Sequence, residues 1–130
     1  MGNWHHVLAV AVGGASGAVL RFAVNEWFRL RAWSSLPLAT LTVNTIGCLL
    51  AGALLVWLEQ RGPQSALWRS LLLFGVLGGL TTFSALSVEL LQFLRAGRTD
   101  LAVLFAAANL LLGLGAVVLG WWLGRIALSQ

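Results

Sequence analysis

The residues best suited to handling an ion lie in one short stretch of an apolar chain, which reads Gly78-Gly79-Leu80-Thr81-Thr82-Phe83-Ser84. Glycines weaken a helix, and unpaired backbone polar groups are costly in hydrocarbon, so this stretch is a poor lipid-facing helix. A broken helix exposes carbonyl oxygens, which are cation ligands, and N–H groups, which are anion ligands. The stretch therefore predicts an ion site or pathway. A glycine kink used only for close packing is the alternative.

A second polar group interrupts the preceding apolar stretch. Asn44 lies one helical turn after Thr40 and one turn before Cys48, so the three residues share a helix face. An asparagine amide offers two N–H donors without a charge, which suits an anion that must shed water without being trapped. A simple hydrogen bond from Asn44 to a neighbouring helix is the alternative.

Phe83 directly follows the glycine-rich stretch, and Ser84 and Ser87 add hydroxyl groups beside it. The edge of a phenyl ring carries partial positive charge, so a ring presented edge-on can contact an anion without holding it strongly. A phenylalanine in an apolar helix otherwise packs in the core or faces lipid. Periodicity alone leaves both roles open.

Composition determines the class of protein that carries these residues. The chain has 130 residues, of which 59% are hydrophobic and 9% charged, with a mean hydropathy of +0.90. These values exclude an ordinary soluble domain. The composition does not change along the chain in a way that would indicate a second domain. We therefore expect one all-α membrane domain over residues 1–130. Its apolar stretches cover about residues 7–24, 38–58, 70–88 and 101–124.

Each stretch is close to the roughly 20 residues that a helix needs to cross a bilayer. The sequence thus predicts four transmembrane helices, with the third broken at Gly78-Gly79. Tryptophans mark the span ends, as expected of an interfacial belt: Trp4, Trp27, Trp33, Trp57, Trp68, Trp121 and Trp122. Glycine pairs with GxxxG spacing, which allow close helix packing, are Gly13/Gly17, Gly75/Gly79 and Gly120/Gly124.

The net charge of +4 comes from arginines scattered at span ends, which excludes the basic patch of a nucleic-acid-binding protein. With four spans, one side of the membrane carries Arg61, Arg69 and Arg125, and the other carries Arg29, Arg31, Arg95 and Arg98. The arginines are thus almost evenly divided between the two sides, and this near balance favours insertion in both orientations. An antiparallel dimer with its two-fold axis in the membrane plane would follow, and a single enforced orientation is the alternative.

Together these motifs resemble those of the Fluc (CrcB) family of fluoride channels. The similarity rests on Arg21 after a glycine-rich first span, on Thr40-Leu41-Thr42-Val43-Asn44, and on the 78–84 stretch followed by Ser87-Val88-Glu89. Length, span count and motif order match over nearly the whole chain. The resemblance implies a multi-pass protein of the cell membrane, in a bacterial inner membrane, that exports cytoplasmic fluoride passively.

The resemblance also implies roles for particular residues. Fluc proteins are dual-topology antiparallel dimers with two fluoride pores and a sodium ion at the dimer centre. By position, Asn44 would donate its amide to fluoride, Phe83 would present a ring edge, and the carbonyls of Gly78 and Thr81 would hold sodium. The same motif includes Thr82, Ser84 and Ser87, and which of these hydroxyls face the pore stays open.

Two positions depart from the family pattern. Leu86 stands where the family has a second phenylalanine, and it lacks an electropositive ring edge. The fourth span, which carries a hydroxyl track in many members, keeps only Asn109 as a polar residue over positions 109–117. Three interpretations of these departures stay open. One aromatic contact is enough for conduction, or the chain is half of a heterodimer in which a paralogue supplies the complete pore, or conduction is slow or lost.

A small multidrug-type exporter is the main competing function, since it also has four short spans. Proton-coupled export needs a membrane-embedded carboxylate. The first span has no acidic residue, and Glu89 lies towards the end of the third span. An enzyme is not expected, because His5 and His6 are adjacent near the N-terminus and no in-span acid or nucleophile is positioned to pair with them.

Overall fold

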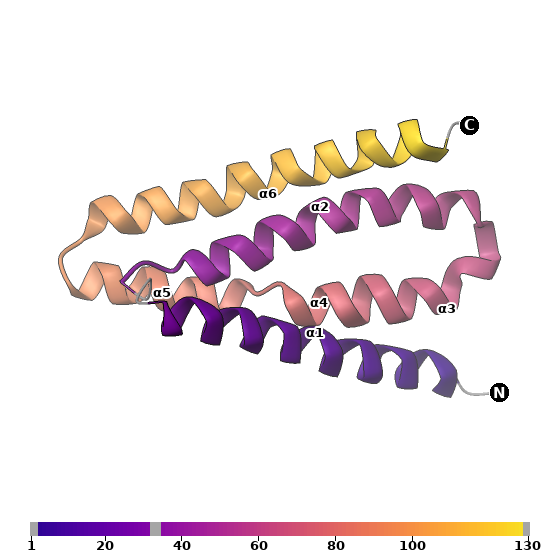
Figure 1. Cartoon of the computed structure of the whole chain (residues 1–130), viewed down its shortest axis with the longest axis horizontal. Helices are drawn as coiled ribbons and strands as arrows, with labels where there is room; N and C mark the ends of the chain where they lie inside the picture. The colour runs from indigo at the N-terminus through magenta and orange to yellow at the C-terminus, as the bar shows by residue number, and fades with distance from the viewer. Residues whose placement is uncertain (1–2, 32–34, 129–130) are drawn as a thin grey trace.

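The computed structural model describes residues 3–31 and 35–128, and the regular elements in these ranges are helices. The spans are α1 (Trp4–Leu30), α2 (Leu38–Gln60), a composite third span over Gly62–Arg95, and α6 (Thr99–Leu128) (Figure 1). All four are long and apolar enough to cross a membrane. The predicted all-α architecture with four spans is confirmed, and each helix is longer than its predicted span.

The third span consists of several segments joined end to end. After a 3-10 turn, η1 (Gly62–Ser65), it continues as α3 (Ala66–Trp68), the wider π-helical η2 (Arg69–Leu77), α4 (Gly78–Leu80) and α5 (Phe83–Arg95). Thr81 and Thr82 lie between α4 and α5 with extended backbones, at φ −81°, ψ 154° and φ −153°, ψ 124°.

The predicted break at Gly78-Gly79 is wrong in position. Gly78 has φ −63° and ψ −35°, which is helical, and Gly79 lies inside α4. The glycines serve a different purpose there, because a Cβ atom on Gly79 would collide with the backbone oxygen of Gly14 on α1. Close approach to α1 therefore requires Gly79, and the backbone leaves the helix three residues after Gly78, at Thr81.

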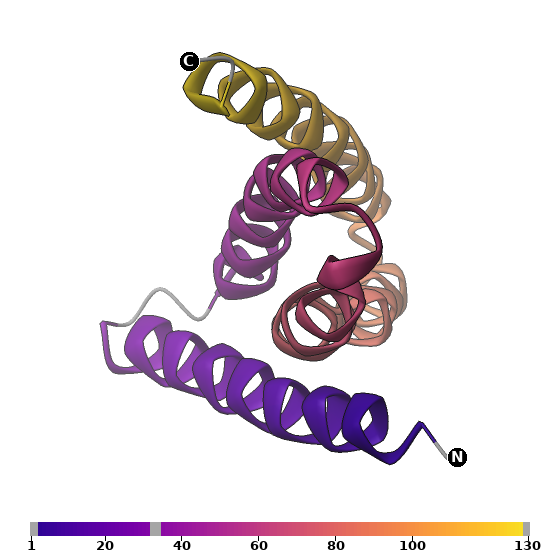
Figure 2. The same cartoon turned by 90° about the vertical axis from the view of Figure 1, so that its right-hand side faces the viewer.

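Glycines also set the other helix contacts. A Cβ on Gly13 or Gly17 of α1 would strike the η2 backbone, and one on Gly52 or Gly120 would strike the backbone across the α2–α6 contact. The spans consequently form two close pairs, α1 with η2 and α4, and α2 with α6. Seen end-on in Figure 2, α1 and α6 lie on opposite sides, with α2 and the third span between them.

The two ends of the bundle have different connections. Both chain termini and the turn between α2 and α3 lie at one end, and the α5–α6 turn lies at the other (Figure 1). Gly62 and Gly97 occupy these turns with φ of +59° and +72°, a left-handed conformation that glycine adopts without a Cβ penalty. The described tryptophans lie in or near terminal helical turns, and Trp33 lies outside the described residues.

Candidate functional site

Two threonine hydroxyls end one helix and begin the next at the interruption of the third span. Thr81 donates its N–H and its Oγ1–H to the carbonyl of Leu77, at 2.9 and 2.8 Å, which completes the last turn before the interruption. The Oγ1 of Thr82 accepts the N–H of Ala85 at 3.1 Å, as an N-cap hydroxyl does. The interruption is thus specified by side chains as well as by backbone.

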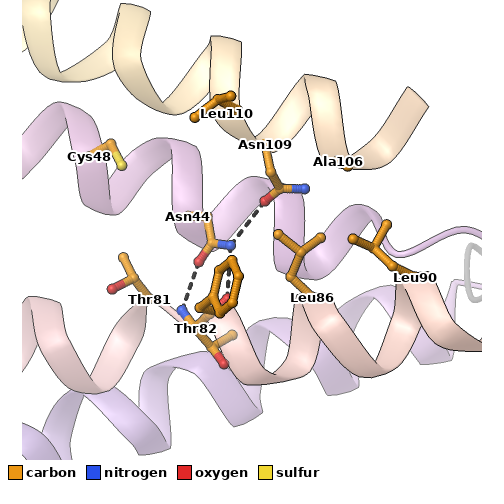
Figure 3. Close-up of a pocket in the computed structure, with 10 residues that line it drawn as sticks. Asn44, Cys48, Thr81, Thr82, Leu86, Leu90, Ala106, Asn109 and Leu110 are labelled. Carbon is orange, nitrogen blue, oxygen red and sulfur yellow. Dashed lines mark hydrogen bonds between the residues drawn. The ribbon is translucent and has the colours of Figure 1, made fainter. Parts of the chain in front are cut away.

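Asn44 of α2 pairs with both backbone polar groups of Thr82. Its Oδ1 accepts the Thr82 N–H at 2.8 Å, and its Nδ2 donates to the Thr82 carbonyl at 3.1 Å. The same Nδ2 donates to Oδ1 of Asn109 on α6 at 2.9 Å (Figure 3). The donor capacity of the Asn44 amide is therefore used within the protein in this conformation. A hydrogen bond to neighbouring segments, one of the two roles considered for Asn44, is present.

Asn109 is fixed from its other side as well. Its Nδ2 donates to the carbonyl of Phe105 one turn earlier on α6, at 3.0 Å. That bond orients its Oδ1 towards Asn44. A continuous series of hydrogen bonds through the two asparagine amides consequently connects the extended backbone at Thr82 to α2 and α6. Unpaired polar groups would be costly in this apolar region.

The interruption leaves the carbonyls of residues 78–81 without their usual helical donors, and for two of them the donor is diverted to a side chain. In an uninterrupted α-helix, the N–H of residue i donates to the carbonyl of residue i−4. The N–H of Thr82 would then donate to Gly78, and here it donates to Asn44. The N–H of Ala85 would donate to Thr81, and here it donates to the Thr82 hydroxyl. Gly78 and Thr81 are the two residues whose carbonyls were expected to hold sodium.

A cavity of about 570 Å³ lies beside this interruption and is open on one face. Its walls come from α2, the third span and α6 (Figure 3), and its lining residues are Asn44, Cys48, Thr81, Thr82, Phe83, Leu86, Leu90, Ala106, Asn109 and Leu110. The cavity is mainly apolar, with the asparagine amides and threonine groups as its polar wall. Phe83 is 81% exposed, whereas Leu86 is only 7% exposed.

The cavity brings together six of the predicted site residues, which are Asn44, Thr81, Thr82, Phe83, Leu86 and Asn109. The remaining four do not line it. Ser84 shares a hydrogen bond with the Thr82 hydroxyl at 3.2 Å, and Ser87 donates back to the Phe83 carbonyl at 2.9 Å. Gly78 lies in α4, and Thr40 is bonded to Glu89.

Cys48, Leu90, Ala106 and Leu110 also line the cavity, and sequence reasoning did not assign them to the site. Helical spacing was the available signal. Cys48 is one turn after Asn44, Leu90 one turn after Leu86, and Ala106 and Leu110 flank Asn109 on α6. Apolar residues at such positions are ordinary in any membrane helix, which is why the signal was not distinctive.

Thr40 and Glu89 form a separate polar contact closer to the α5–α6 end. The Thr40 hydroxyl donates to Oε1 of Glu89 at 2.5 Å. The other carboxyl oxygen, Oε2, is buried, and it has no hydrogen-bond partner among the described residues. Thr40 was expected to share the polar face of Asn44, and its hydroxyl is instead engaged by this carboxyl group.

Comparison with known proteins places the chain in a family. A family model described as "CrcB-like protein, Camphor Resistance (CrcB)" matches residues 8–121. A fluoride-specific ion channel FluC of Xanthomonas euvesicatoria pv. vesicatoria is 47% identical over 117 residues, covering 90% of this chain and 88% of the relative. A protein of the same name from Xylella fastidiosa (strain 9a5c) is 45% identical over 121 residues, covering 93% and 85%. The chain belongs to the CrcB-like family.

Proposed function

We propose that the chain forms a fluoride-selective channel through which fluoride leaves the cytoplasm passively. The relatives are named fluoride-specific ion channels, so the chain belongs among membrane transport proteins and is not an enzyme. Its four spans make it a multi-pass membrane protein, and the relatives favour a bacterial inner membrane as its location. The observation that carries the proposal is the cavity at the interruption, where amides, hydroxyls and Phe83 meet.

Fluoride is small and strongly hydrated, so a pore must replace its water with N–H, O–H and ring-edge donors. Asn44 can supply an N–H only by giving up one of its present acceptors. The bond to Asn109 is the one to exchange, because a side chain can rotate away whereas the Thr82 carbonyl is part of the backbone. We therefore assign fluoride contacts to the Asn44 amide, with Asn109 as the group that releases it.

Phe83 supports a second part of the proposal, which concerns assembly. A side chain that is 81% exposed beside an open cavity is poorly placed for an ion pathway within one copy of the chain. A second copy in the opposite orientation would cover this face and enclose the pathway. We propose an antiparallel homodimer on this ground and on the near-balanced arginines. A heterodimer with a paralogue differs only in the identity of the covering chain.

Sodium is the cation that we propose for the dimer centre. The support is local, since the carbonyls of residues 78–81, which include the two proposed ligands Gly78 and Thr81, lose their usual helical donors at the interruption. Carbonyl oxygens suit a hard cation. When bound, the ion would neutralise the carbonyl dipoles and hold the two interruptions together. The residues of this chain present the oxygens and set their direction.

Glu89 is the observation that favours the competing function of a proton-coupled cation exporter. A membrane carboxyl group with one buried, unpartnered oxygen is a candidate proton carrier. It lies with Gln92 and Phe93 at a small cavity of about 230 Å³, away from the larger one. The fluoride proposal leaves Glu89 without a transport role, and the exporter proposal requires it.

One assay separates these functions. Purified protein is reconstituted into vesicles loaded with fluoride, and efflux is followed with a fluoride electrode after the electrical potential is released by a potassium ionophore. A channel of the proposed type releases fluoride rapidly and chloride negligibly. Uptake of a lipophilic toxic cation driven by a proton gradient would instead support the exporter. If the vesicles neither release fluoride nor take up the cation, the chain is a subunit that conducts only with a partner chain or does not conduct at all.

A further inference from the structure

A groove lies along the C-terminal ends of α2 and α6. Both helices end at the end of the bundle that carries the chain termini (Figure 1). The volume of the groove is about 450 Å³, and Val56, Glu59 and Gln60 of α2 face Trp121 and Arg125 of α6 across it. A smaller hollow of about 300 Å³ adjoins it and shares Trp121 and Arg125. The groove therefore continues around the outer side of α6.

Opposite charges line this groove without neutralising each other. The ion pairs recorded among the described residues join Arg29 to Glu26 and Arg98 to Asp100, and neither involves Glu59 or Arg125. The carboxylate and the guanidinium thus stand more than a contact distance apart in one cavity. A ligand that carries both charges would fit between them.

Arg125 is held in a position suited to an anion. Its guanidinium lies over the Trp121 ring, with its Cζ 4.9 Å from the ring centroid. Stacking of this kind uses the face of the guanidinium and leaves its N–H edges available for bidentate contacts to a phosphate. The ends of the two helices are joined by a bond from the Gln60 Nε2 to the Leu128 carbonyl at 3.4 Å, which keeps the groove walls together.

The tryptophans near the groove are the basis for placing it at the depth of lipid headgroups. Tryptophan rings concentrate at the boundary between hydrocarbon and headgroups, Trp121 lines the groove, and Trp57 directly follows Val56 on α2. Val56 at its inner end is buried, whereas Glu59 and Arg125 are exposed. An apolar inner wall below a charged rim matches a molecule with acyl chains and a charged head.

We propose that this groove binds a phosphatidylethanolamine-type phospholipid, with Arg125 donating to the phosphate and Glu59 accepting from the primary ammonium. The choice among lipids follows from the donors and acceptors. A choline headgroup has no N–H to offer Glu59. A glycerol headgroup has no positive charge and would place its phosphate near an unpaired carboxylate. This proposal does not depend on which ion the protein conducts.

The test measures lipid retention on the purified full-length protein by native mass spectrometry, after titration with ethanolamine, choline and glycerol phospholipids of the same acyl chains. Loss of a hydrogen bond between charged groups changes affinity by about tenfold. The wild type should therefore retain the ethanolamine lipid about tenfold better than the choline lipid. Glu59→Gln should remove that preference, and Arg125→Gln should weaken all three lipids.

Arg98→Gln is the matched control, because Arg98 is an exposed arginine in the turn just before α6, at the opposite end of the bundle, and pairs with Asp100. It should leave all three retentions unchanged, and monodisperse elution in detergent shows that each variant is folded. Equal retention of ethanolamine and choline lipids by the wild type would overturn the proposal. So would a preference that survives Glu59→Gln, or displacement of the lipid by an equal concentration of free phosphoethanolamine.

Discussion

Asn44 and Thr82 are joined by two hydrogen bonds, in which one side-chain amide pairs with both polar groups of one extended residue, at 2.8 and 3.1 Å. The contact resembles a single rung of a β-ladder made by a side chain. It pairs both backbone polar groups of Thr82 inside an apolar span, where unpaired groups would be costly. The interruption of the third span is therefore supported from α2, which also carries the proposed anion donor.

Asn44→Asp should abolish fluoride efflux. The aspartate keeps an acceptor for the Thr82 N–H, but it loses the donor to the Thr82 carbonyl and to Asn109. Unpaired buried acceptors cost about 1–3 kcal/mol each, so thermal stability in detergent should fall too. Asn25→Asp, an exposed residue near the end of α1, is the control and should leave both readouts unchanged. Normal flux through Asn44→Asp would remove this amide from the pathway.

Phe83→Ile should stop fluoride efflux while leaving the folded chain intact. The ring is 81% exposed, and exposed substitutions usually change stability by less than about 0.5 kcal/mol. Packing within one copy should therefore be unaffected, and an unchanged dimer mass in detergent would show that the loss of flux reports the missing ring edge and not a defect at the contact with the second copy. Phe74→Ile, on the same span and 61% exposed, is the matched control. If the two variants behave alike in the electrode assay, Phe83 has no special role.

Leu86→Phe should increase fluoride efflux by supplying the second ring that the family pattern contains. Leu86 is 7% exposed and lines the open cavity, so part of the added volume can extend into free space. The remaining crowding should cost about 1–3 kcal/mol, seen as a lower midpoint of thermal unfolding. Leu90→Phe is the control. It adds the same ring one helical turn further along α5, and we expect no increase in fluoride efflux from it. A folded Leu86→Phe protein with unchanged or lower flux would contradict the prediction.

Gly79→Ala should destabilise the contact between α1 and α4. The added methyl would meet the Gly14 carbonyl, and relieving such overpacking costs about 1–3 kcal/mol. Gly115→Ala is the matched control, because among the described residues no atom beyond the surrounding turns of its own helix lies within 4 Å of the new methyl group. Alanine is the better helix former by up to about 1 kcal/mol, so this variant should be slightly stabilised. Equal thermal shifts in the two variants would argue against a close packing role for Gly79.

Replacing sodium with choline throughout purification should lower both the thermal stability and the fluoride flux, and returning sodium should restore them. The reason is that the carbonyls of Gly78 and Thr81 would lose the cation that compensates their dipoles. Potassium at the same ionic strength controls for salt effects. Identical melting and flux in sodium, potassium and choline would mean that these carbonyls do not require sodium.

The spans were predictable because length and hydropathy alone determine which segments cross a bilayer. The position of the interruption was not, because glycine signals both a weak helix and a close contact. At Gly79 the close contact decided the outcome. The sequence does contain a threonine, Thr82, directly before a helical segment, which is typical of an N-cap. The two glycines before it were the stronger indication of a break, so the break was predicted at the glycines.

The site was partly predictable for a similar reason. Asn44 and Asn109 were recognised as unusual polar residues in apolar spans, but a sequence contains no information on distance across helices, so their mutual bond was not foreseen. Thr40 was grouped with Asn44 by helical spacing. Its partner turned out to be Glu89, which is 49 residues away in the chain.

The pairing of Asn44 with Thr82 also has a consequence for the order in which the chain is made. Asn44 precedes Thr82 by 38 residues, so its span is synthesised and enters the bilayer first. The extended peptide finds a partner as soon as it arrives, before the fourth span exists. Asn109 comes last and accepts the remaining amide hydrogen. Membrane insertion of the first three spans can thus proceed with both backbone polar groups of Thr82 already paired.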